Sequence, residues 1–376
     1  MSSSSNNSGG GEQWAWLGLL KWTLAHQDGT RPSNESPTMM SDEDKAFLEK
    51  VMAEGIIDES ERMKFILEQF SNAMEYYKNE SQQIDSEEKQ EQPLTPPDEG
   101  DLEDLLQELR DIVEQVDYAR GFVNLKGCSY LLGAIGATTS GPSPMPVVPN
   151  GIRNMCLGIL ATLAQNNPPV QKELLELGSI KILSDLFLLN VSATPLSTKT
   201  KIMQAISAIV RCYDLTESVF EQLPQAPDLM VQGLSSDPNV ASDSLRAKTL
   251  FFLRAFLTSD NSTPARAKKF QHAILMIADT NSQYLNDGTN EDGDPDVVAI
   301  QLRESAIALL QQLLQRRLAV NLLFQRKNLL AAQGVKRIQQ LRETKGEEAE
   351  LSRTELQHWE AFLIQLARAE PEEVIS

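Results

Sequence analysis

The sequence predicts an all-α protein, a solenoid of three-helix repeats, and two observations carry this prediction. The first is the segment 153–189, in which apolar residues recur at helical spacing over three successive stretches. Residues 166–169, Asn-Asn-Pro-Pro, stop the first helix, and Gly178 lies where a helix end needs left-handed backbone. The second observation is that this unit recurs along the chain.

Four copies align when Arg153 is placed in register with Lys199, Arg246 and Arg303. The copies start 46 (153 to 199), 47 (199 to 246) and 57 (246 to 303) residues apart. The positions three, seven and ten residues further on are apolar or small: Cys156, Ile202, Thr249 and Ala306; Leu160, Ile206, Leu253 and Leu310; Leu163, Ile209, Phe256 and Leu313. A three-helix period in the forties is typical of armadillo or HEAT repeats. We therefore expect the second of these sets to be buried along one seam.

A degenerate earlier copy over residues 102–136 precedes these four. One unit cannot cover its own apolar faces, so neighbouring units must stack, which makes an armadillo/HEAT-like α-solenoid. The predicted organisation is a disordered segment 1–40 with an apolar motif at 14–25, a helical extension 41–77, an acidic, proline-containing linker 78–101, repeats 102–345, and a capping helix with a tail 346–376. Two loops interrupt the repeats, a proline-rich one at 138–150 and a polar one at 281–296.

The apolar motif at residues 14–25 lies between polar segments and has several possible readings. A signal peptide is disfavoured by Glu12 and by Lys21 within the apolar run, and a matrix-targeting peptide by the lack of arginine before Arg31. The segment is then either a helix docked on the solenoid or a mobile peptide that binds a partner.

Composition limits the classes of partner. The net charge of −19 disfavours nucleic acid and anionic membranes, which attract basic proteins, and favours a partner with basic patches. The three cysteines, Cys128, Cys156 and Cys212, lie in apolar helical patterns and indicate reduced thiols in a cytoplasmic protein. No apolar run approaches the roughly 20 residues that span a bilayer.

The sequence gives no sign of catalytic chemistry. His26, His272 and His358 are scattered without metal-ligand spacing, and no glycine-rich run matches a phosphate loop. The acidic stretch 286–296 lacks calcium-loop register and is better explained as a solvated loop. We expect neither an enzyme nor a protein with a metal or other cofactor, and we expect a monomer.

Protein binding is the function that remains. In stacks of this type we expect the third helices to line the concave face, here residues 128–136, 179–189, 228–234, 267–279 and 335–344. The candidate contact residues are the polar positions of these helices: Lys181, Asp185, Gln232, Lys268, Lys269, His272, Lys336 and Arg337.

Three stretches carry a resemblance to a known family. They are Leu-Leu-Lys-Trp-Thr-Leu-Ala at 19–25 before Asp-Gly-Thr, the segment 105–127, and the run Ala-Gln-Asn-Asn-Pro at 164–168 with Gln171. They resemble the armadillo-type nucleotide exchange factors of the 70-kDa heat-shock chaperones, the group related to the heat-shock-70-binding protein. The resemblance covers about residues 14–30 and 100–345, with Gln165, Asn166, Asn167 and Gln171 as signature residues. The insertions at 41–101, 138–150 and 281–296 depart from the family pattern.

The resemblance implies a co-chaperone whose concave face binds the ATPase domain of a 70-kDa chaperone and promotes ADP release. It also implies that an apolar segment aids client release by mimicking a client: Trp14, Trp16, Leu19, Leu20, Trp22 and Leu24. The alternative is a generic armadillo scaffold without exchange activity. A transport-type groove is disfavoured, because all four tryptophans lie outside the repeats.

Overall fold

The computed structural model describes residues 58–83, 96–136, 147–280, 284–285 and 297–370. The chain divides into two compact units, Met1–Arg62 and Met63–Ser376, and almost all described residues belong to the second. The apolar motif at 14–25 and the acidic loop 286–296 lie outside the described residues. Every regular element in the described ranges is a helix, which confirms the predicted all-α class.

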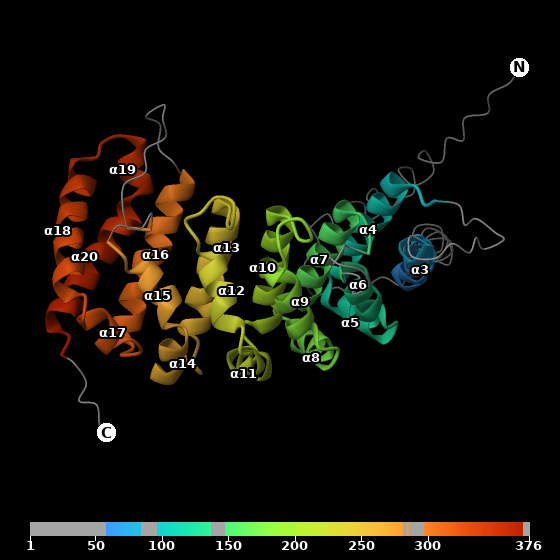
Figure 1. Cartoon of the computed structure of the whole chain (residues 1–376), viewed down its shortest axis with the longest axis horizontal. Helices are drawn as coiled ribbons and strands as arrows, with labels where there is room; N and C mark the ends of the chain where they lie inside the picture. The colour runs from blue at the N-terminus through green and yellow to red at the C-terminus, as the bar shows by residue number, and fades with distance from the viewer. Residues whose placement is uncertain (1–57, 84–95, 137–146, 281–283, 286–296, 371–376) are drawn as a thin grey trace, which may run out of the picture. The chain divides into compact units, whose positions relative to one another are not determined.

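The repeat is one long helix followed by shorter ones (Figure 1). The successive groups are α4 (Glu99–Val113), α5 (Val116–Asn124) and α6 (Gly127–Ile135); α7 (Asn150–Ala164), α8 (Pro168–Glu176) and α9 (Ser179–Leu188); α10 (Leu196–Val210), α11 (Asp214–Gln222) and α12 (Ala226–Gly233); α13 (Asp243–Leu257), α14 (Pro264–Lys269) and α15 (Gln271–Ile277); α16 (Val297–Gln315), α17 (Val320–Phe324) and α18 (Lys327–Glu343). Helix α3 (Glu59–Gln83) precedes them, and α19 (Glu347–Leu351) and α20 (Arg353–Arg368) follow.

The long helices pack next to one another in the order α4, α7, α10, α13, α16 and α20 (Figure 1). Leu160, Ile206, Leu253 and Leu310 are fully buried in this layer, so the seam predicted from the repeat register is confirmed. Helix α20 packs against α16 and α18 and buries Trp359 and Phe362, which closes the apolar core at the last repeat.

Local sequence explains where the helices end. Pro168 and Pro169 occupy the first turn of α8, where a missing N–H costs nothing. Asn166 after α7 and Cys212 after α10 are 46 residues apart (212 − 166) and both have left-handed backbone, with φ of 51° and 62°. Gly178 has φ of 72° between α8 and α9, the conformation expected there for glycine.

Two predicted boundaries differ in the structure. The helix expected at 267–279 is two helices, α14 and α15, which meet at Phe270. The linker expected at 78–101 is shorter, because α3 continues to Gln83 and α4 begins at Glu99. Asp98 explains the second difference, since its carboxylate accepts a hydrogen bond from the backbone N–H of Asp101 at 3.1 Å and caps α4.

The position that aligns the repeats holds a buried cation in all four copies: Arg153, Lys199, Arg246 and Arg303. Arg153 donates to the carbonyl of Ile135 at 3.0 Å and to that of Ala193 at 2.9 Å. Arg246 donates to the carbonyls of Ser235 at 3.0 Å and Ala241 at 2.6 Å. Ile135 ends α6, Ser235 follows α12, and Ala193 and Ala241 lie in the segments before α10 and α13. These two arginines therefore join their long helices to neighbouring segments through backbone carbonyls outside or at the end of helices.

One helix of the described part, α16, has the length and apolar composition to cross a membrane. More than half of its apolar window, 56%, is buried against the rest of the chain, as in the core helix of a packed domain.

Candidate binding cleft

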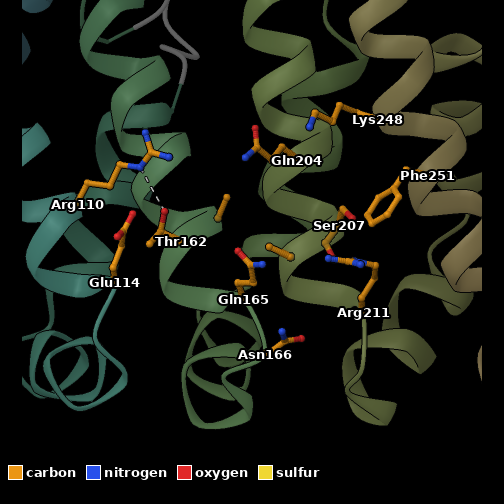
Figure 2. A pocket seen from close by; sticks show the side chains of 12 residues that line it. Arg110, Glu114, Thr162, Gln165, Asn166, Gln204, Ser207, Arg211, Lys248 and Phe251 are labelled. Atoms are coloured by element: carbon orange, nitrogen blue, oxygen red, sulfur yellow. Dashed lines mark hydrogen bonds between the residues drawn. The ribbon is translucent and has the colours of Figure 1, made fainter. Parts of the chain in front are cut away.

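A cleft of about 600 Å³ runs across four consecutive long helices (Figure 2). Helix α4 contributes its last turn, α7 and α10 their second halves with the residues after them, and α13 its middle. The lining residues are Arg110, Glu114, Ala161, Thr162, Gln165, Asn166, Gln204, Ser207, Ala208, Arg211, Lys248 and Phe251.

The cleft follows the repeat register. Gln165 and Arg211 occupy equivalent positions in successive copies, 46 residues apart (211 − 165), and Gln204 and Phe251 do so 47 residues apart (251 − 204). Three of these four positions hold polar residues and the fourth holds Phe251, and residues three to four apart on a helix share one face. The cleft is therefore built by repetition of one helix face.

At one end of the cleft, Arg211 stacks on Phe251 across α10 and α13, with its guanidinium carbon 4.6 Å from the ring centroid. The Nε–H of Arg211 also donates to the carbonyl of Ser207 at 3.2 Å. Figure 2 shows this pair facing the cleft, with Lys248 further along α13. The stack leaves Phe251 52% exposed and holds the guanidinium in one orientation.

At the other end, Arg110 of α4 reaches across to α7. Its Nε lies 3.4 Å from Thr162 Oγ1, the contact dashed in Figure 2. The lining thus contains three cations, Arg110, Arg211 and Lys248, and one carboxylate, Glu114. No described carboxylate forms an ion pair with any of the three cations. The cleft is positively charged in a chain whose net charge is −19.

The contact residues predicted from the sequence lie elsewhere. None of Lys181, Asp185, Gln232, Lys268, Lys269, His272, Lys336 and Arg337 lines the cleft. The prediction assumed that third helices form the inner surface, whereas the cleft lies on the first, long helix of each group. The apolar period alone does not show which of the three helices in a repeat lines a groove. The polar residues at repeated positions on the long helices are the sequence signal that indicates it.

Several of these predicted residues make contacts within the fold. Lys181 and Asp185 form an ion pair one turn apart on α9, and Asp185 also accepts from the side-chain amide of Gln225 at 2.9 Å. The ammonium group of Lys269 contacts the backbone carbonyl of Glu221 in the preceding group. Lys268 lines a separate hollow between α14 and α17.

Arg337 was wrongly predicted as a surface contact. It is 2% exposed, and its guanidinium binds the Glu355 carboxylate of α20, with Nε–Oε1 at 2.8 Å and Nη2–Oε2 at 3.1 Å. Arg303 Nε lies 3.4 Å from the same carboxylate. Arg337 therefore joins α18 to α20 and is not available to a partner, and Arg303 adds a contact from α16.

The signature residues divide into two pairs. Gln165 and Asn166 are exposed and line the cleft. Asn167 is buried, and so is Gln171, whose amide nitrogen binds the carbonyls at the end of the next long helix. These are the carbonyls of Ala208, Ile209 and Arg211, at 3.0, 3.0 and 2.8 Å. Gln171 thus caps α10 from α8 and supports the cleft wall from behind.

Two of the three thiols are inaccessible. Burial, with a smaller contribution from the charge of Glu173, raises the pKa of the Cys128 thiol to about 12. Burial also raises the pKa of Cys156 well above its ordinary value, while Cys212 is exposed.

Within the residues that the structure describes, no three His, Cys, Asp or Glu side chains gather as metal ligands would.

Comparison with known proteins adds only a general likeness. No protein-family model and no curated protein matches the chain. Among solved structures, a designed armadillo repeat protein is 15% identical with a TM-score of 0.46, covering 72% of this chain and 96% of its own. A second, in complex with the peptide (KR)4, is 16% identical with a TM-score of 0.44, covering 71% and 95%. A third, computationally designed for modular peptide recognition, is 15% identical with a TM-score of 0.47, covering 71% and 95%.

At such scores this likeness says nothing about ligands, and the fold class rests on the chain's own helix order. That order, one long helix and shorter ones repeated around a continuous core, defines an all-α solenoid with armadillo-like groups.

Proposed function

We propose that this chain is a binding protein and not an enzyme, and that it holds a partner protein in the cleft on its long helices. The cleft extends over four repeats and combines an exposed aromatic ring, amides and cations, the mixture that protein recognition sites use. Its walls are rigid helices joined by buried polar contacts, so the surface is formed before the partner arrives.

More specifically, we propose a cytoplasmic co-chaperone, a nucleotide exchange factor that acts as a monomer on the ATPase domain of a 70-kDa heat-shock chaperone. One observation carries this step: Gln165 and Asn166, from the run that resembles the exchange-factor family, line the cleft. Two of the four signature residues therefore lie in the cleft, and Gln171 supports its wall.

Exchange would follow from linkage. If the cleft binds the nucleotide-free ATPase domain more tightly than the ADP-bound domain, then binding must weaken ADP by the same factor. A rigid surface is suited to weakening ADP binding, because the ATPase domain and not the solenoid must then change conformation when the two bind. The chain itself needs no nucleotide site for this action.

The test is release of fluorescent ADP from a 70-kDa chaperone after addition of the full chain. We expect faster release with the wild type, and a rate close to basal with the double variant Arg211→Glu and Lys248→Glu. Lys172→Glu on α8 is the matched control, because Lys172 is exposed and outside the cleft. Basal release with the wild-type chain would exclude exchange activity.

Lys181→Glu distinguishes the two candidate surfaces. If the third helices bind the chaperone, as the sequence alone suggested, this variant should lose exchange while the cleft variant keeps it. The second candidate function, a scaffold without exchange activity, predicts partner binding that the cleft variant abolishes and no effect of either protein on ADP release.

A further inference from the structure

The strongest feature that the proposed function leaves unexplained is the charge of the cleft. The chain carries 53 acidic and 34 basic residues, so a random patch of its surface should be acidic. The cleft has three cations against one carboxylate. We propose that it binds an acidic peptide segment of its partner, with Asp or Glu carboxylates on Arg110, Arg211 and Lys248 and an apolar side chain on Phe251.

The three cations are available for this role. Lys248 is exposed and forms no ion pair in the described part of the chain. Arg110 bonds to the neutral hydroxyl of Thr162, and Arg211 to a backbone carbonyl, so neither charge is compensated by a carboxylate. Each guanidinium keeps N–H groups that can donate to a carboxylate in the paired geometry that arginine favours.

Phe251 adds the apolar part of the site. A phenyl ring that is 52% exposed costs free energy to leave in water, and a peptide side chain laid on it would recover part of that cost. The Arg211 guanidinium already covers one side of the ring, with its carbon 4.6 Å from the centroid. In the bound segment, an acidic side chain could pair with Arg211 while a neighbouring apolar side chain packs on Phe251.

The shape favours a peptide over a small anion. The cleft crosses four helices and places Arg110 on α4 and Lys248 on α13, with α7 and α10 between them. A single phosphate or carboxylate could meet only one end of this row. An extended segment could meet both ends, and the amides of Gln165 and Gln204 between them could bind its backbone.

This inference rests on the cleft as the partner-binding site but not on exchange activity, so it is tested without a chaperone. A labelled twelve-residue peptide of Glu, Asp and Leu is titrated with the full chain and followed by fluorescence anisotropy. Comparison peptides carry Gln and Asn, or Lys, in place of the acidic residues. We expect binding of the acidic peptide alone, weakening as salt is raised toward the range where exposed charges are screened.

The variants locate the site. Lys248→Gln should weaken the acidic peptide by about threefold, the size expected for one exposed charge pair, and Arg110→Gln and Arg211→Gln by similar factors. The triple variant should weaken it by about thirtyfold if the charges act independently. Lys172→Gln, which removes an exposed charge outside the cleft, should leave the affinity unchanged, and equal melting midpoints would show that all variants fold.

Three results would overturn the proposal: equal binding of the acidic and Lys peptides, loss of affinity in Lys172→Gln as large as in Lys248→Gln, or displacement of the peptide by millimolar inorganic phosphate. The last would mark an anion site and not a peptide site. Peptide binding together with basal ADP release would support the cleft specificity and exclude only the exchange function.

Discussion

At the scale of single residues, the most informative side chain is Gln171. It is 0% exposed, and its amide nitrogen reaches three carbonyls of the next repeat. In the sequence it is one polar residue on a short helix, and only the resemblance singled it out. Its role could not be predicted because the carbonyls it binds lie 37 to 40 positions away.

Gln171→Ala should therefore lower the free energy of unfolding by about 2–4 kcal/mol, since each buried hydrogen bond contributes about 1 kcal/mol and the carbonyls would be left unpaired. Urea unfolding measures this, with Lys172→Ala as the exposed neighbouring control. Equal midpoints for the two variants would contradict the capping role.

The thiols give a second prediction at this scale. In the native protein at pH 8, one cysteine should react rapidly with a disulfide reagent, and three should react after denaturation. Cys212 is exposed, whereas Cys128 and Cys156 are buried with raised pKa values, which removes both access and thiolate. Cys212→Ser should abolish the rapid phase; a rapid phase that survives this substitution would place a reactive thiol elsewhere.

At the scale of helices, the apolar pattern of the sequence predicted the repeat but did not indicate which of its helices lines the cleft. The residues seven positions after each aligned cation are all buried, because burial repeats with the helix. Which helix faces the cleft depends on how neighbouring groups rotate against each other, and apolar spacing does not record that rotation. Gln204 on α10 and Arg211 directly after it are polar residues in an otherwise largely apolar stretch, and they mark the side of this helix that lines the cleft.

Leu253→Ala tests the core seam. Leu253 is fully buried on α13, so its truncation should cost about 2–5 kcal/mol through lost burial and a remaining cavity. Leu215→Ala on α11 is the control, because Leu215 is 54% exposed and its truncation should change stability by less than about 0.5 kcal/mol. Thermal or urea midpoints would measure both, and equal losses would contradict the register.

The junction of α16 and α20 should respond to pH. Burial lowers the pKa of His358; the charge of Glu304 opposes this and that of Arg254 adds to it. His358 Nδ1 lies 2.6 Å from the side-chain oxygen of Gln311, to which the neutral ring can donate. With a lowered folded pKa, the unfolded chain takes up the proton first, so stability falls as pH drops below about 6.5 and levels off below the folded pKa.

The measurement is the melting midpoint between pH 7 and pH 5 for the wild type and His358→Gln, which can keep a hydrogen bond to Gln311. The wild type should lose more stability than the variant over this window. Parallel curves for the two proteins would show that the ring does not contribute.

At the scale of the whole molecule, the two proposed activities, ADP release and client release, can be tested separately. The apolar motif at 14–25 stands outside the described residues, and its role as a client mimic rests on the resemblance. Deletion of residues 1–30 should leave ADP release intact and slow the discharge of a bound peptide from the chaperone. A motif docked as a helix predicts the reverse, a lower melting midpoint with unchanged discharge.

The buried cations also limit which duplications and deletions of sequence the fold can accept during evolution. Arg153 reaches back to Ile135 and forward to Ala193, and Arg246 reaches back to Ser235. A duplicated or deleted block keeps the register of these contacts when its length is one repeat, 46 or 47 residues. A block of another length would separate a buried cation from its carbonyls. The 57 residues before Arg303 accommodate their surplus between α15 and α16. Recombination should therefore preserve whole repeats while loops between them lengthen freely.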